Sequence, residues 1–375
     1  MRIGSLFSGI GGLDLAVEAA TGGRVVWHCE RDAYCRRVLA RHWPDAELFD
    51  DVSALSSPPA VDVLIAGFPC QDLSSASQTR TGLDGERSGL FYELVRIVGE
   101  VQPAVVVIEN VPALLKWRPT VDAEFAALGY RCRWARLYAS NAGAPHYRRR
   151  VFIVATRSEG FELSAPMMDL PRGSSRPWPT PTCGDARASG SRSLPSSDAH
   201  AGASLTDAVR PDRKKPGHWP TPTVAIATGG QSSRSGTRKG ERLLSGMARD
   251  LWPTPKTRDY KSGTGTHEGN LPERQGSRDL PELLGGRLDP RWVAQLMGFV
   301  DGWIEPEGDP LTGYADRWPA GPDRAQHAWE SPRLMFGKPV RGRPAMLRAL
   351  GNAVVPQQAA LALEYLLPQT HKATT

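Results

Sequence analysis

Apolar runs and helix-like patterns alternate along the first 157 residues of the chain. Short runs typical of buried strands are expected at residues 2–7, 24–30, 61–67, 104–110, 132–139 and 151–157. Apolar positions at helical spacing lie between them, at residues 12–20, 33–43, 89–101 and 121–129. Because strands that alternate with helices form parallel sheets covered on both faces, the pattern predicts an α/β fold with a doubly wound, mostly parallel sheet.

The alternation stops near Arg157. Residues 158–285 are rich in Gly, Pro, Ser, Thr and Arg, and they contain three Trp-Pro-Thr-Pro segments that begin at Trp178, Trp219 and Trp252. Their unequal spacing argues against a solenoid, whose units must stack regularly. Large rings on proline-stiffened turns favour an irregular domain held by a few anchors.

Apolar patterning returns at residues 291–303 and 343–367. Its last part, residues 356–367, predicts a helix with Pro356 in the first turn, where proline is tolerated. We therefore expect a larger domain made of residues 1–160 and 335–375, and a smaller domain made of residues 161–334.

The net charge of +6 is concentrated in the middle of the chain. Between Met167 and Asp289 there are 19 basic and 13 acidic residues, whereas the remainder has 27 of each. Such an excess is either a solvated basic surface or a footprint for a polyanion such as nucleic acid.

Cysteine usage and hydropathy exclude several classes of protein. The five cysteines include no Cys-x-x-Cys pair, which argues against a disulfide framework and a zinc site. No run of 18 or more apolar residues occurs, and the N-terminal residues have a strand pattern rather than that of a signal peptide. We expect a cytoplasmic protein with neither a metal nor a membrane partner.

A glycine-rich turn follows the first predicted strand. It consists of Phe7, Ser8, Gly9, Ile10, Gly11 and Gly12. Glycines let a backbone approach a ligand and direct amides at it, and Glu30, at the end of the second strand, is placed to accept hydrogen bonds from ribose hydroxyls. Asp51 and Val52 precede the next strand and either meet the base or form a plain turn. The pattern predicts a nucleoside cofactor.

Reactive side chains follow three other predicted strands. Pro69 stiffens the turn before Cys70, which is either a buried apolar thiol or a nucleophile. Glu109 lies at the end of a buried strand, where a carboxylate is costly unless it is paired with another group or takes part in catalysis. Arg148 and Arg150 come just before the last strand, beside the same edge of the sheet, although a basic cluster alone is usually a solvated face.

The order of these motifs resembles that of C5-cytosine DNA methyltransferases of bacterial or phage type. The stretches are LFSGIGGLDLA, AGFPCQDLS, RSGLFYELVRIV, IENV, HYRRRVF, LMGFVDGW and LGNAVVP. The resemblance covers residues 1–157 and roughly 287–366. Two positions depart from it, because His146 stands where the family usually has glutamine and Arg31 where it often has an aromatic residue. The first leaves Arg148 and Arg150 in register, and the second affects the contact with adenine.

The resemblance implies a Rossmann-like domain that transfers a methyl group from S-adenosyl-L-methionine to C5 of a cytosine flipped out of a specific duplex DNA sequence. The thiolate of Cys70 would add to C6, and C5 of the resulting enamine would take the methyl group. Glu109 would hold the N3 and N4 edge and protonate N3. Arg150 would hold O2, and Arg148 would fix the nucleotide or its phosphate.

The resemblance also assigns supporting roles. Pro69 and Gln71 flank the nucleophile and are expected to bind the substrate, while Asn352 and Ala353 would close the cofactor pocket. Residues 73–88 would form a lid over the DNA. Residues 161–334 would form a target-recognition domain that reads the major groove.

Other functions fit less well. A nicotinamide oxidoreductase would share the glycine turn and Glu30, but it would not explain why Cys70, Glu109 and Arg150 meet at one edge. A DNA-binding protein with a dead site would not need both the cysteine and the acid. An RNA cytosine methyltransferase on the same framework is the main alternative. We expect a monomer, with a cognate restriction enzyme as a candidate partner.

Overall fold

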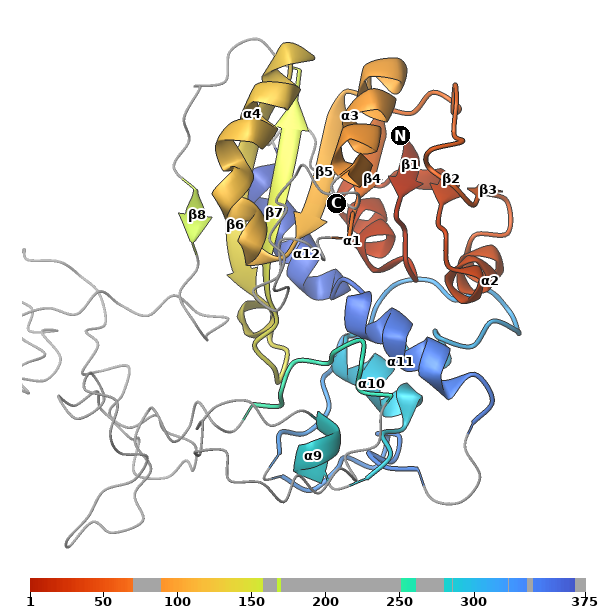
Figure 1. Cartoon of the computed structure of the whole chain (residues 1–375). Coiled ribbons are helices and arrows are strands. Elements are labelled where there is room, and N and C mark those ends of the chain that lie inside the picture. Colours follow the sequence, from red (N-terminus) through yellow and green to blue (C-terminus); the bar gives the residue numbers. More distant parts are fainter. Residues whose placement is uncertain are drawn as a thin grey trace, which may run out of the picture. The chain divides into compact units, whose positions relative to one another are not determined.

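The computed structural model describes residues 1–69, 89–157, 167–169, 251–260, 280–284, 286–322, 324–335 and 340–367 (Figure 1). Four sequence predictions lie outside the described residues. They are the nucleophile Cys70, its neighbour Gln71, the lid at 73–88 and the first two Trp-Pro-Thr-Pro segments.

Eight strands of the described residues form one sheet, in the order β3-β2-β1-β4-β5-β7-β6-β8. The strands are β1 (Arg2–Leu6), β2 (Arg24–Cys29), β3 (Glu47–Phe49), β4 (Val63–Ala66), β5 (Val105–Asn110), β6 (Arg131–Tyr138), β7 (Arg149–Thr156) and β8 (Met168–Asp169). Pairing is parallel from β3 to β5, and β7 runs antiparallel to both β5 and β6. The predicted α/β, mostly parallel sheet is confirmed. The pattern missed β3 and β8, whose three and two residues are too few to recognise.

The centre of the sheet is apolar on both faces. Every residue of β4 and of β5 is buried, as expected for parallel strands between two layers of helices. Gly4 of β1 makes room for the indole of Trp27 on β2, because a Cβ at Gly4 would lie 2.2 Å from that ring. A small residue in the first strand therefore allows a large ring to fill the core beside it.

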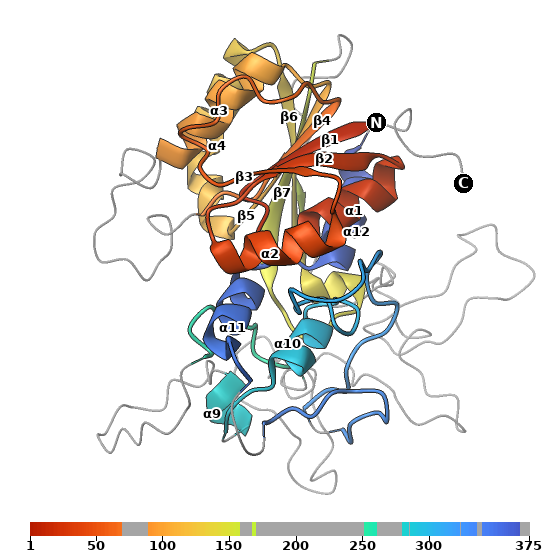
Figure 2. The same cartoon turned by 90° about the vertical axis from the view of Figure 1, so that its right-hand side faces the viewer.

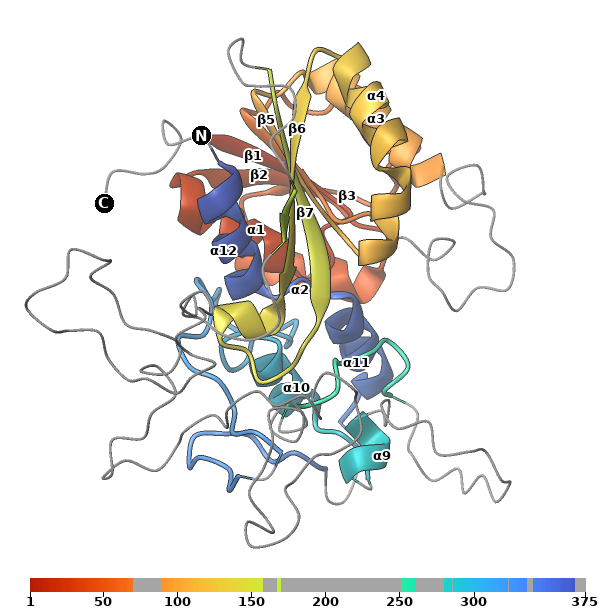
Figure 3. The same cartoon turned by 90° about the vertical axis from the view of Figure 1, so that its left-hand side faces the viewer.

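Helices cover both faces of the sheet. Figures 2 and 3 show α3 (Gly89–Val101) and α4 (Arg118–Ala127) on one face, with α1 (Gly12–Thr21) and α12 (Pro356–Leu366) on the other. The remaining α-helices of the described residues are α2 (Ala33–His42), α9 (Leu280–Leu284), α10 (Pro290–Leu296) and α11 (Arg343–Asn352), and short 3-10 helices occupy Pro112–Trp117 and Ala139–Ala142. The helices expected at residues 12–20, 33–43, 89–101 and 356–367 are confirmed.

Local chemistry explains where these helices begin. The carboxylate of Asp32 accepts hydrogen bonds from the amides of Tyr34 and Cys35, which caps α2. Helix α1 instead begins after Gly11, whose φ of 82° lies in the left-handed region and whose residue type offers no capping side chain. The amides of the first turn of α1 are therefore left without a side-chain cap.

The chain divides into two compact units. Residues 1–173, 253–320 and 325–375 form one, and residues 174–252 with 321–324 form the other. The first unit contains the sheet and every site described below. The assignment of residues 161–334 to target recognition concerns function and stays a prediction.

Within the described residues, no helix combines the length and the apolar character needed to cross a membrane.

Candidate active site

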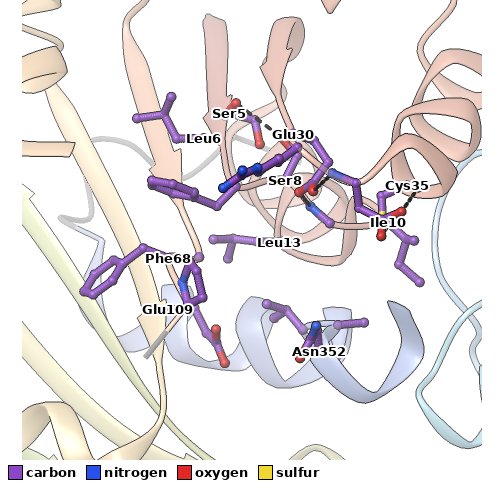
Figure 4. A pocket seen from close by; sticks show the side chains of 18 of the residues that line it. Ser5, Leu6, Ser8, Ile10, Leu13, Glu30, Cys35, Phe68, Glu109 and Asn352 are labelled. Carbon is purple, nitrogen blue, oxygen red and sulfur yellow. Dashed lines mark hydrogen bonds between the residues drawn. The ribbon is translucent and has the colours of Figure 1, made fainter. Parts of the chain in front are cut away.

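A cavity of about 930 Å³ opens at the carboxyl ends of β1, β2, β4 and β5 (Figure 4). It lies where the strand order reverses, because the chain runs outward from β1 toward β3 and then from β4 toward the other edge. Sequence-predicted site residues that line it are Phe7, Ser8, Gly9, Ile10, Glu30, Asp51, Val52, Pro69, Glu109, Arg150, Asn352 and Ala353. Two predicted site residues within the described part of the chain, Gly11 and Arg148, do not line it.

The glycine turn is shaped by close packing. Gly9 and Gly11 have φ values of 58° and 82°, which favour glycine. A Cβ at Gly11 would lie 2.4 Å from the ring of Trp43, and a Cβ at Gly12 would lie 2.3 Å from the carbonyl oxygen of Val354. Packing therefore excludes a side chain at Gly11 and at Gly12, whereas the space beside Gly9, which lines the cavity, is open. An uncapped helix N-terminus of this kind suits an anionic ligand group.

A distant tryptophan fixes the same turn. The indole of Trp303 donates a hydrogen bond to the carbonyl of Ile10 at 2.9 Å, and its ring stacks on His42 with centroids 3.8 Å apart. His42 in turn donates from Nε2 to the carbonyl of Trp303 and accepts at Nδ1 from the amide of Leu311. Burial lowers the pKa of His42 to about 4, so the ring is neutral near pH 7. Sequence reasoning missed this role, although Trp303 ends the recognised stretch LMGFVDGW.

Glu30 joins the second strand to the glycine turn. Its Oε2 accepts from the amide of Gly9 and its Oε1 from the amide of Asp32, both at 2.7 Å. Burial raises the pKa of Glu30, and the two amide hydrogen bonds oppose this. Figure 4 shows Glu30 and Ser8 together on one side of the cavity, with Phe68 and Glu109 on the other.

Glu109 and Arg150 form a buried ion pair. The Nε atom of Arg150 lies 2.8 Å from Oε1 of Glu109, and their side chains are 15% and 9% exposed. The pair joins the end of β5 to the start of β7, two antiparallel neighbours. Burial raises the pKa of Glu109, whereas the positive charges of Arg150 and Arg148 act in the opposite direction. The structure brings these two predicted catalytic residues together.

Arg148 is held by backbone carbonyls outside the cavity. The buried guanidinium donates from Nη2 to the carbonyls of Gly351 and Ala353, at 3.1 and 2.6 Å, and from Nη1 to the carbonyl of Pro255 at 3.3 Å. These contacts support the wall formed by Asn352 and Ala353. The predicted contact of Arg148 with the nucleotide stays a prediction.

Asn110 fixes the turn that leads to the predicted nucleophile. Its Nδ2 donates to the carbonyl of Phe68 at 3.1 Å, and its Oδ1 accepts from the amide of Val111 at 2.8 Å. The next residue after Phe68 is Pro69, which lines the cavity, and Cys70 follows it. At the end of β5, Glu109 therefore lines the cavity, and the side chain of Asn110 holds this turn.

His146 has a structural position. It is fully buried, and its Nε2 lies 3.0 Å from the carbonyl of Leu296 at the end of α10. Burial and the nearby Arg148 lower the pKa of His146 to about 3, so the ring is neutral. His146, which stands where the family usually has glutamine, therefore links the segment before β7 to α10.

The comparison with protein families agrees with this fold. A family model described as "C-5 cytosine-specific DNA methylase" matches residues 1–314. The chain belongs to this family.

Among the described residues, no group of three or more His, Cys, Asp or Glu side chains could hold a metal ion.

Individual relatives are similar over part of their length. The chain is 34% identical over 168 residues to a Bacillus subtilis protein named Type II methyltransferase M2.BsuMI, which is 42% of this chain and 43% of that protein. It is 33% identical over 160 residues to Type II methyltransferase M.CviJI of Paramecium bursaria Chlorella virus IL3A, covering 41% and 42% of the two chains. The chain thus spans about two fifths of the length of these curated relatives.

A solved structure shares the fold. The DNMT2 protein of Spodoptera frugiperda superposes with a TM-score of 0.51 at 16% identity, covering 97% of this chain and 99% of that chain. At this identity the likeness concerns the architecture alone.

Proposed function

We propose that this chain transfers the methyl group of S-adenosyl-L-methionine to C5 of a cytosine in a specific duplex DNA sequence. The observation that carries the proposal is a single cavity with two chemically different sides. The glycine turn and Glu30 lie on one side, and the Glu109–Arg150 pair lies on the other. Family membership supports the same assignment.

The first side of the cavity fits a nucleoside with an amino-acid tail. The space beside Gly9 in the glycine turn is open, because a Cβ built there would meet no described atom within 4 Å, and this leaves room for a ligand. Glu30 is placed to accept hydrogen bonds from ribose hydroxyls, with Asp51 and Val52 toward the base. Asn352 and Ala353 would close the pocket. When bound, S-adenosyl-L-methionine supplies an electrophilic methyl group.

The second side fits a cytosine that has left the base stack. Arg150 would donate to O2, and Glu109 would accept from N4 and give a proton to N3. Protonating N3 offsets the charge that develops when a thiolate adds to C6. Burial favours the protonated form of Glu109, while Arg150 fixes the orientation of the carboxyl group. Cys70, with Pro69 and Gln71 beside it, would supply the thiolate.

Duplex DNA is the polymer that we propose. The excess positive charge between Met167 and Asp289 would track phosphates while residues 161–334 read the sequence. The printed names of the relatives are of Type II methyltransferases, which favours a modification enzyme with a cognate restriction enzyme. We propose a cytoplasmic monomer. RNA methylation receives less support, because the likeness to a DNMT2 protein is one of fold.

Sequencing after bisulfite treatment tests the proposal directly. A plasmid from cells that express the chain should carry protected cytosines within one short sequence, and cells that express Cys70→Ala should give none. Purified protein should transfer label from the methyl donor to duplex DNA and not to RNA. Labelled RNA with unlabelled DNA would support the alternative, and no labelling of either would contradict the proposed activity.

A further inference from the structure

Three polar side chains lie buried beneath the glycine turn. Ser5 on β1 and His28 on β2 are register partners in the parallel pair, and Asp14 belongs to the first turn of α1. Oδ1 of Asp14 lies 3.2 Å from Nδ1 of His28, and both side chains are 1% exposed. Ser5 and Asp14 line the cavity, and Figure 4 shows Ser5 on the side of Glu30 and Ser8. Ser5 and Asp14 are therefore part of the cofactor side of the cavity, whereas His28 does not line it.

Apart from the ion pair between Asp14 and His28, the hydrogen-bonding capacity of this cluster is unused. Both carboxylate oxygens of Asp14, both ring nitrogens of His28 and the hydroxyl of Ser5 lack hydrogen-bond partners among the described residues. A buried carboxylate without such partners is costly, because it has lost its hydration. A ligand with hydrogen-bond donors and positive charge would offset that cost.

The neighbourhood of Asp14 is acidic. Within the described part of the chain, its ion-pair partner is His28, which is charged only when protonated. Glu18 lies one turn further along α1, and its Oε1 is already used by the amide of Val25 and the indole of Trp43. A fixed cation from Lys or Arg does not pair with Asp14 in these residues. The position therefore suits an external cation.

The charges around the cavity favour the same kind of ligand. Six acidic residues line it, including Asp14 and Glu30, against three arginines, Arg31, Arg150 and Arg348. In S-adenosyl-L-methionine, the sulfonium and ammonium groups each carry a positive charge, and only the carboxylate carries a negative charge. The cofactor is thus a net cation, and an acidic cavity attracts it.

We propose that Asp14 is the counter-ion of the α-ammonium group of the cofactor, an assignment that rests on the proposed function. The ammonium and carboxylate groups of an amino acid share one carbon, so both must be accommodated within one small region. The uncapped amides of α1 suit the carboxylate. Asp14 projects from that same first turn and offers the opposite charge. Ser5 and His28 lie beside it with free hydrogen-bonding groups.

The test compares two ligands by calorimetry on the full chain. One is S-adenosylhomocysteine, which keeps the α-amino group, and the other is its analogue without that group. The wild-type chain should bind the first about tenfold or more tightly, the scale of a charge-assisted hydrogen bond. Asp14→Asn should weaken binding of S-adenosylhomocysteine by a similar factor and leave the analogue nearly unaffected. The preference between the ligands should therefore disappear.

His28→Asn is the matched control, because it removes the neighbouring ring and keeps the carboxylate. It should retain the preference for the amino ligand. A preference that survives Asp14→Asn would overturn the proposal and indicate that Asp14 serves only to pair with His28. An equal loss for both ligands would also overturn it, since that result marks a structural role.

Two further outcomes keep the proposal testable. If thermal melting shows that Asp14→Asn is unfolded, the wild-type comparison decides, and equal affinities for the two ligands would overturn the assignment. If the wild-type chain binds neither ligand, the proposed function fails, and the assignment of Asp14 fails with it. If the wild-type chain binds both ligands with equal affinity, the role of Asp14 is contradicted, but the proposed function is not.

Discussion

The side-chain amide of Asn110 donates a hydrogen bond to the backbone carbonyl of Phe68, at 3.1 Å. Asn110 ends β5, and Phe68 lies in the turn that follows β4, so this bond joins two neighbouring strands at the edge where the cavity opens. Because Phe68 precedes Cys70 by two residues, the bond sets the path of the chain into the predicted nucleophile.

Asn110→Asp should slow methyl transfer by about tenfold or more, because a misplaced nucleophile loses much of the benefit of orientation. The variant keeps an oxygen that accepts from Val111, loses the donor to Phe68 and, when ionised, places a negative charge beside the carbonyl of Phe68. Affinity for S-adenosylhomocysteine should change little. Single-turnover rates and calorimetry measure the two effects separately, and an unchanged rate would contradict the positioning role.

Glu109→Gln should slow transfer by about 10²-fold, the scale of losing a general acid, and should leave DNA affinity largely intact. Burial raises the pKa of Glu109, and donation to N3 requires the protonated form. The wild-type rate should therefore fall as pH rises above that pKa. The falling limb should be absent in Glu109→Gln, because an amide does not titrate. A limb of the same shape in both proteins would assign it to another group.

Arg148→Met should lower the free energy of unfolding by a few kcal/mol, because three buried carbonyls lose their donor. It should also weaken cofactor binding through the wall at Gly351 and Ala353. Arg149→Met, at the exposed next position, is the control and should change stability by less than about 0.5 kcal/mol. If Arg148→Met instead weakened DNA binding at unchanged stability, the contact with the nucleotide predicted from the sequence would be supported.

His42 should make stability fall in acid. Its pKa drops from 6.5 to about 4 on burial, so the unfolded chain binds a proton more readily between these values. The stabilisation is fully present above pH 6.5 and is lost as pH falls toward 4. At about 1.4 kcal/mol for each pKa unit, it amounts to roughly 3 kcal/mol. His42→Gln should reduce this part of the pH dependence in denaturant melts, and an identical profile would contradict it.

The sequence was a good guide to the sheet, because its central strands β4 and β5 consist mostly of consecutive apolar residues. The sequence also predicted that Glu109 and Arg150 lie at the same edge of the sheet. They do so because the carboxyl end of β5 lies beside the start of its antiparallel neighbour β7. The sequence could not separate Arg148 from Arg150. The two lie two residues apart in the same basic run, and only the packing of Gly351 and Pro255 shows that one faces carbonyls.

Other parts of the site depend on contacts that no local pattern contains. The role of Trp303 is set by a hydrogen bond to Ile10, which lies 293 residues away in sequence. Asp14 looked like an ordinary polar position in the first turn of a helix, where acids are common. Its burial beside His28 becomes visible only when β2 is placed next to α1.

The glycine turn at Phe7–Gly12 packs against residues that come almost 300 or more positions later in the chain. Trp303 holds the carbonyl of Ile10, and the carbonyl of Val354 packs over Gly12. During synthesis on the ribosome, the first strands therefore emerge long before the segments that pack against the glycine turn. The turn that we propose to bind the cofactor is therefore completed only after residue 354 has left the exit tunnel, and we expect an interrupted translation product to lack it.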